Sequence, residues 1–251
     1  SFQFGRIAFG GLVPPSLETV RAAVQAEKDG GDVDMSALAP QLGFVELGKT
    51  AVTIVDGPSL SVDHYRLDLK DYVGTVPTTI SLALGGADIP VDLVPEPRLA
   101  AFLHRFGYER VNVDAGADIA WRGDTTGVTS YHFAMKDLAA VSGNATLTGL
   151  TPADAGHLHS SDEALAKLSL TGGSLTFKDD SIIGRSLDEQ AKRLNTDPVK
   201  FRQQFALGLP FMLTFLGNPD LQKQLAPVLQ SLIRSAGSLT AVATPAAPIA
   251  L

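Results

Sequence analysis

The sequence predicts an α+β fold, with one long, twisted antiparallel β-sheet of about eight to ten strands in a meander and amphipathic helices packed on its apolar face. Two observations predict it. The middle of the chain alternates strictly between apolar and polar residues, and the segments that flank it carry apolar residues at helical spacing. With 45% hydrophobic and 19% charged residues, the 251-residue chain can bury a substantial core, which excludes a disordered protein.

The central strands carry the clearest pattern. Every second residue from 111 to 121 is apolar, which is typical of a strand with one buried face, and we expect Trp121 at its end to be buried. A turn-forming segment at 122–127 leads into a second run, and a third run covers 141–148. The second run places three large apolar side chains on one face: Tyr131, Phe133 and Met135. The short links between these runs require antiparallel pairing.

Further strands are expected on both sides of this meander. Residues 63–71 and 80–84 alternate in the same way, and a final strand is expected at 238–243. Weaker strand patterns cover residues 2–9, 43–55, 165–171 and 174–178.

Helices are indicated by their start signals and spacing. Pro97 opens one helix that closes at Gly107, and Asp197-Pro198 and Asn218-Pro219 open two others. The expected helices are 14–28, 97–107, 183–194, 197–216 with a break near Pro210, and 218–235. We therefore expect a β-rich part over 1–180 with two inserted helices, and a helical part over 181–251 whose last strand joins the same sheet, together forming one domain.

Composition excludes several functions and sets expectations for others. The net charge is −7 and no basic run occurs, so nucleic acid is not an expected partner. Cysteine is absent, which excludes disulfides and thiolate sites. The longest uncharged apolar stretch, 205–217, is shorter than the ~18 residues that span a bilayer. The chain begins Ser1-Phe2-Gln3 without an apolar leader, so we expect that a signal peptide was removed or the chain was trimmed.

No catalytic motif stands out. Nucleophile elbows, phosphate-binding loops and dinucleotide glycine fingerprints are all missing from the sequence. His157 and His159 have the spacing of a metal-ligand pair on a strand, but their segment is also typical of a solvated loop. His64 and His132 fall on the polar faces of their strands. We expect no catalytic residue, no metal and no cofactor.

The helix expected at 197–216 is apolar nearly all round in its second half. Such a segment is buried on several sides, enters a membrane interface, or lines an apolar cavity. The hypothesis is that this half forms one wall of a ligand pocket and that the sheet forms the other. The first wall would be Leu209, Phe211, Met212, Phe215 and Leu216, and the second Tyr131, Phe133 and Met135.

The order of several segments resembles that of exported proteobacterial envelope proteins with AsmA-like character, which are described mainly as domains of unknown function. The segments are Phe106-Gly107-Tyr108-Glu109-Arg110-Val111, Trp121-Arg122, the stretch 179–187, Asp197-Pro198, and the ending Ser238-Leu239-Thr240-Ala241-Val242. The resemblance implies a periplasmic location and provides no catalytic residue.

Two functions follow as hypotheses, and a hydrolytic enzyme is a third. A curled sheet capped by helices is the plan of lipid-carrying half-barrels, so the first hypothesis is a non-catalytic periplasmic protein that binds or carries a lipid or another hydrophobic ligand. The alternative is a structural or protein-interaction subunit of a cell-envelope complex, with a filled core and no ligand. Contact with a membrane or an envelope protein is compatible with both.

Overall fold

A computed structural model describes the chain except for residues 32, 34, 56, 124–125, 156–165 and 236. It shows an α+β fold built on one open antiparallel sheet of 13 strands, rather than the eight to ten expected. The strands are β1 (Phe2–Phe4), β2 (Ile7–Gly10), β3 (Phe44–Leu47), β4 (Thr50–Thr53), β5 (Ser59–Val62), β6 (His64–Val73), β7 (Val76–Pro90), β8 (Arg110–Trp121), β9 (Thr126–Met135), β10 (Ala139–Thr148), β11 (Ser169–Asp179), β12 (Ser238–Ala243) and β13 (Ile249–Ala250).

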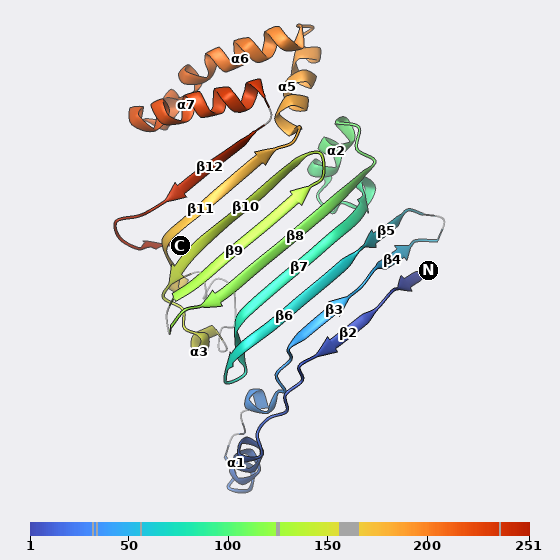
Figure 1. Ribbon diagram of the computed structural model, residues 1–251, viewed down its shortest axis with the longest axis vertical. Coiled ribbons are helices and arrows are strands. Elements are labelled where there is room, and N and C mark those ends of the chain that lie inside the picture. Colours follow the sequence, from blue (N-terminus) through green and yellow to red (C-terminus); the bar gives the residue numbers. More distant parts are fainter. Residues whose placement is uncertain (32, 34, 56, 124–125, 156–165, 236) are drawn as a thin grey trace.

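The sheet is a meander from β6 to β11, and it forks at β7 (Figure 1). The first part of β7 pairs with β6, which continues through β3 to β2, and the last part of β7 pairs with β5, which continues through β4 to β1. At the other edge, β12 and β13 both pair with β11. The strand expected at 238–243 is confirmed, and it begins and ends at the expected residues.

The helices lie at the ends of the sheet. They are α1 (Leu17–Lys28), α2 (Pro97–Arg105), α3 (Pro152–Ala155), α5 (Ile182–Arg193), α6 (Pro198–Met212) and α7 (Pro219–Arg234), with 3₁₀ turns η1 (Met35–Leu38), η2 (Val91–Leu93) and η3 (Leu213–Leu216). Their start signals act as expected: Asp197 Oδ1 accepts from Lys200 N at 2.9 Å, and Asn218 Oδ1 accepts from Leu221 N at 3.1 Å.

The two faces of the sheet differ completely in polarity. Because residues paired across antiparallel strands share a face, the register defines rows that cross the sheet. One row runs over nine strands and is apolar throughout: Ile7, Leu47, Tyr65, Leu84, Ala115, Phe133, Val141, Phe177 and Leu239. A second row of the same face is Phe9, Val45, Leu67, Leu82, Ala117, Tyr131, Gly143, Leu175 and Ala241. We call the face that holds both rows the apolar face.

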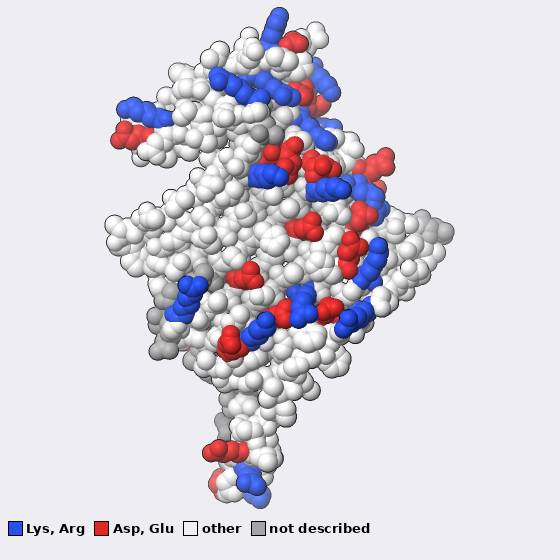
Figure 2. All heavy atoms as spheres, in the orientation of Figure 1, with Lys and Arg blue, Asp and Glu red and all other residues white. Residues whose placement is uncertain are grey.

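The opposite face carries the polar residues that alternate with these rows. Figure 2 shows that its charged side chains gather over the β6–β8 side of the sheet, whereas the β9–β12 side carries few charges. Arg66 organises the charged part: its guanidinium donates to Glu46 at 2.6 Å and to Asp68 at 2.7 and 2.8 Å, and it lies 4.7 Å from the ring centre of Phe44. This hydrogen-bonded guanidinium holds the pKa of Asp68 below its usual range.

Helix α2 covers one end of the apolar face. Leu103 of this helix is fully buried against Ala87, Val111 and Val113, at the ends of β7 and β8. Phe102 and Leu99 pack against the same cluster, so the i, i+3, i+4 spacing predicted from the sequence faces the sheet. This cluster is the main core of the molecule.

The segment that holds α3 approaches the other end of the same face. The indole Nε1 of Trp121 donates to the carbonyl of Leu150 at 3.0 Å, and α3 contacts β7. Leu150 is buried, whereas Trp121 is half-buried, less than expected, because it lies at the end of its strand. Thr151 and Asp154 start α3 with reciprocal bonds: Thr151 Oγ1 donates to Asp154 Oδ2 at 2.7 Å, and Asp154 N donates to Thr151 Oγ1 at 3.0 Å.

The helices α5, α6 and α7 do not pack on the apolar face as expected. They pack on one another beyond the ends of β11 and β12, as Figure 1 shows, around a second core of Leu187, Ala206, Leu209 and Ile233. Arg202 ties α6 to α5 through two bonds to Asp188, at 2.6 and 2.9 Å. We call these three helices with η3, residues 181–235, the C-terminal bundle. Helices α2 and α3 lie against the two ends of the apolar face, and the first residue of α5, Ile182, packs against the core at the α2 end.

Candidate functional site

The middle of the apolar face, between α2 and α3, is open to solvent. Four large side chains on three strands are exposed there: Leu82 of β7 by 37%, Tyr131 and Phe133 of β9 by 41% and 42%, and Leu175 of β11 by 46%. They belong to the two apolar rows, in which no Asp, Glu, Lys, Arg or His stands. We call the part of the two rows from β7 to β11 the apolar floor.

The dimensions of the floor follow from the sheet. Four strand spacings separate β7 from β11, the two sides of the floor, or roughly 19 Å at about 4.8 Å per spacing. Along β8, eight residues separate Val113 under α2 from Trp121 under Leu150, or roughly 26 Å at about 3.3 Å per residue. A floor of this size is on the order of the largest apolar patch that a soluble monomer exposes, and such patches are often functional.

Both ends of the floor are held by specific contacts. At the α2 end, the carboxylate of Glu96 caps the helix by accepting from Arg98 N, and the hydroxyl of Tyr108 donates to Asp137 O at 2.9 Å. At the α3 end, the bonds of Asp154 with Thr151, and secondarily the ammonium of Lys167 nearby, lower the pKa of the Asp154 carboxyl. The two helices at the ends of the floor therefore begin with carboxylate side chains, whereas the middle of the floor has none.

The side chains of the floor are uncharged and almost all apolar. The resolved pKa shifts belong to Arg66, Asp68, Arg110 and Asp154, none of which stands in the rows of the floor. Within the described ranges, no three His, Asp or Glu residues gather as a metal site would require. His157 and His159 lie outside the described residues. The side chains of the floor can contact alkyl or aromatic groups, and the hydroxyl of Tyr131 is the polar side-chain group in the two rows from β7 to β11.

The structure separates the two groups of residues expected to form one pocket. Tyr131 and Phe133 lie in the floor, and Met135 packs under α2. Leu209 is buried in the C-terminal bundle, and Phe211, Met212 and Phe215 are exposed on that bundle. The side chain of Leu216 lies outside the described part. The expected pocket wall from this helix is therefore absent from the floor, because α6 packs on α5 and α7 instead of on the sheet.

Two floor residues were not among those expected. Leu82 of β7 and Leu175 of β11 complete the row of Tyr131, with Ala117 between Leu82 and Tyr131 and Gly143 between Tyr131 and Leu175. Their alternation placed them on the apolar face of a strand. Only the register, which depends on pairing across the sheet, shows that they lie beside Tyr131.

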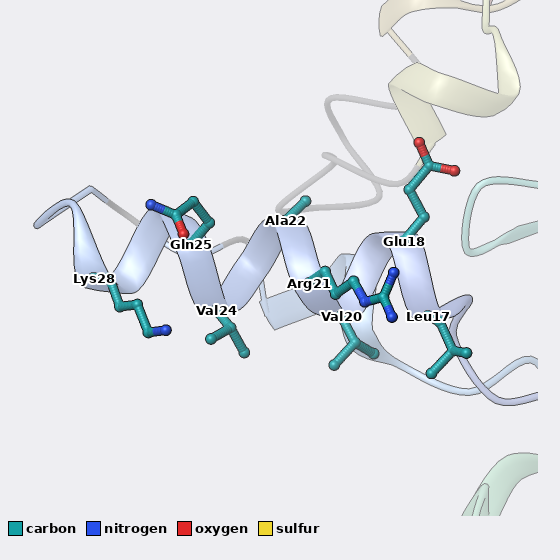
Figure 3. A pocket seen from close by; sticks show the side chains of 8 residues that line it. All are labelled: Leu17, Glu18, Val20, Arg21, Ala22, Val24, Gln25 and Lys28. Carbon is teal, nitrogen blue, oxygen red and sulfur yellow. The ribbon is translucent and has the colours of Figure 1, made fainter.

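A second apolar surface runs along α1, which projects beyond the sheet on the side opposite to the C-terminal bundle (Figure 1). Figure 3 shows Leu17, Val20 and Val24 on it, beside Arg21 and Glu18. All residues that line this surface come from one helix, so it has no opposite wall and cannot enclose a ligand.

Among the described helices, none combines the length and the apolar character needed to cross a bilayer.

Comparison with known proteins adds one partial match. A family model described as "Uncharacterized protein" matches residues 132–251, which run from within β9 through the C-terminal bundle to the end of the chain. No curated protein and no solved structure matches the chain. The matched part includes Phe133, Leu175 and all of α6, and it does not include β7, β8 or α2.

Proposed function

We propose that this protein is a non-catalytic binder or carrier of a lipid or another hydrophobic ligand, and that the ligand lies on the apolar floor between α2 and α3. The observation that carries the proposal is a group of four half-exposed side chains in the middle of the apolar face: Leu82, Tyr131, Phe133 and Leu175. The periplasmic location that we propose with it rests on the resemblance to exported envelope proteins.

The size of the floor supports an acyl chain as the occupant. One leaflet of a bilayer holds its acyl chains in about 15 Å of hydrocarbon, half of the usual ~30 Å core. A chain of that length fits between the α2 and α3 ends of the floor. Full burial of a side chain of the size of Leu or Phe contributes roughly 1.5–3 kcal/mol, so covering four that are already half-buried contributes on the order of 3–6 kcal/mol.

The polarity of the ends supports an amphipathic ligand. The floor itself carries no charged side chain. The carboxylates of Glu96 and Asp154 belong to the helices at its two ends. The opposite face of the sheet carries charged side chains and faces solvent. A ligand with one apolar chain and a polar head matches this distribution.

The alternative, a structural subunit of an envelope complex, would cover the same floor with a protein partner. The unpaired outer edge of β12, which is free of charged residues over Ser238–Ala243, favours this second candidate because such an edge can add a strand. The two candidates differ in whether the purified chain binds a lipid without any other protein.

Uptake of a fluorescent fatty acid by the purified chain tests the proposal. Phe133→Asp places a charge in the middle of the floor, and it should weaken uptake at least tenfold. His132→Asp is the matched control, because His132 is the neighbouring residue on the opposite face of β9, and it should leave uptake unchanged. Circular dichroism of both variants establishes that the fold is retained. Equal uptake by the two variants would show that the probe binds elsewhere, and no uptake by the wild-type chain would favour the structural subunit.

A further inference from the structure

Helix α6 has two apolar faces, and only one of them is buried. Ala206 and Leu209 belong to the second core and are almost fully buried, and Leu213 at the start of η3 is buried as well. Four residues apart on the outer face, Leu207 is 71% exposed, Phe211 82% and Phe215 80%. Residues spaced by four lie along one side of a helix, so these three form a continuous outer stripe.

The position of the outer stripe suits contact with an extended surface. Figure 1 shows α6 on the far side of the C-terminal bundle, with α7 between it and β12. Nothing in the described chain covers the stripe. Aromatic side chains that remain exposed at the outer side of a molecule are typical of segments that enter a membrane interface.

The charge of the C-terminal bundle differs in sign from that of the rest of the chain. Residues 181–235 contain seven Lys and Arg and four Asp and Glu, a net charge of +3, while the whole chain carries −7 and the remainder therefore −10. This bundle is the part of the chain that an anionic surface would attract, and the sheet would be repelled.

Basic residues lie directly beside the outer stripe. A surface hollow next to it is lined by Val199, Gln203 and Leu207 together with Arg202 and Arg234. Arg202 is bound to Asp188, but none of the ion pairs recorded for the described residues includes Arg234. An apolar wall with a cationic group beside it is the arrangement that recognises a phospholipid, with its acyl part and its phosphate.

We propose that the outer stripe of α6 and η3 docks this protein on a membrane that contains anionic phospholipids. Phe211 and Phe215 enter the headgroup region, and Arg234 faces the lipid phosphates. The inference rests on the proposed function in one respect: docking would bring the apolar floor close to a source of lipid.

The lack of native cysteine makes a direct test available. Phe215→Cys and Leu194→Cys, each labelled with an environment-sensitive fluorophore, report the surroundings of the outer stripe and of an equally apolar exposed position at the end of α5. With vesicles of equal parts phosphatidylcholine and phosphatidylglycerol, the emission at 215 should shift to the blue and that at 194 should not. Vesicles of phosphatidylcholine alone should give a much weaker shift.

Binding measurements on variants complete the test. Phe211→Asp with Phe215→Asp should weaken binding to the anionic vesicles on the order of a hundredfold, and Arg234→Gln about fivefold. Leu194→Asp is the control and should have no effect. A wild-type chain that ignores anionic vesicles, or a label at 215 that does not shift on binding, overturns the inference. So does light scattering that shows a dimer which the double variant dissociates, because a second copy would then cover the stripe.

Fatty-acid uptake without vesicles separates this inference from the proposed function. If docking is observed without uptake, the proposed function fails and the docking surface stands. If uptake is observed without docking, the docking surface fails and the proposed function stands.

Discussion

The side-chain amide of Gln230 in α7 donates to the backbone carbonyl of Ala206 in α6 at 3.0 Å. That carbonyl would normally accept from the N–H of residue 210, four positions later, but residue 210 is a proline and has no N–H. Ala206 is fully buried, so its carbonyl would otherwise lack a partner. This bond explains why α6 continues through Pro210 to Met212 before it tightens into η3, instead of breaking near the proline as the sequence suggested.

Replacing Gln230 should therefore destabilise the C-terminal bundle. Gln230→Met keeps the volume but leaves the Ala206 carbonyl unpaired, which should lower the free energy of unfolding by about 1–3 kcal/mol in urea denaturation. In a Pro210→Ala background, residue 210 supplies the missing N–H, and the same substitution should cost clearly less. An equal cost in both backgrounds would mean that Gln230 acts only through its packing.

The indole N–H of Trp121 connects the α3 end of the apolar floor to Leu150. Removing this donor should destabilise that end. Trp121→Phe keeps most of the apolar contact but leaves the buried Leu150 carbonyl without its partner, at a cost of about 1–3 kcal/mol. Because Trp121 is the one tryptophan of the chain and is half-buried, its emission maximum should lie between those of buried and exposed indole. Emission typical of fully exposed indole would contradict this placement.

The start of α3 should respond to pH through Asp154. The hydroxyl of Thr151 is the main cause of the lowered pKa of Asp154, so the ionised carboxylate stabilises the folded form. This stabilisation is fully present above the unfolded pKa of about 3.9 and is lost as the pH falls through the lower folded value. Hydrogen exchange at the backbone amides of Thr151 and Asp154, compared at matched intrinsic rates, should be slow at neutral pH and should accelerate below about pH 3.9.

Thr151→Val is the control for this prediction. It removes the hydroxyl, so the folded pKa of Asp154 should rise toward that of an ordinary aspartate. The loss of protection should then be smaller and should be complete at a higher pH than in the wild type. If the wild type and Thr151→Val lose protection over the same pH range, Asp154 is not the group responsible.

The alternation of apolar and polar residues was sufficient to predict the central strands, but it did not predict the full length of β7. Alternation predicts its middle part, 80–84, and then meets Gly85-Gly86, which ends the pattern. The strand continues to Pro90 through a shift in register, where Gly86 has φ +59° and its N–H bonds to Asp114 at 2.9 Å. The positive φ of Gly86 favours glycine, and a Cβ there would also lie 2.3 Å from a carboxylate oxygen of the distant residue Asp63. Sequence alone does not show such a contact.

The candidate site was predicted in part for the same reason. Tyr131 and Phe133 were identified because their alternation within one strand is a local property. The positions of their neighbours Leu82 and Leu175 depend on the register of four strand pairings, from β7 to β11. The separation of Phe211 and Phe215 from the sheet depends on where α6 packs. The sequence did show that the second half of this helix has more apolar residues than one packed stripe uses. The outer stripe consists of these additional apolar residues.

The central claim is that the apolar floor holds a lipid, and native mass spectrometry of gently purified protein tests it most directly. The account predicts a fraction of the protein with added mass equal to that of a lipid, and the loss of this fraction in Phe133→Asp but not in His132→Asp. A spectrum with only the mass of the bare chain, before and after incubation with fatty acid or phospholipid, would contradict it.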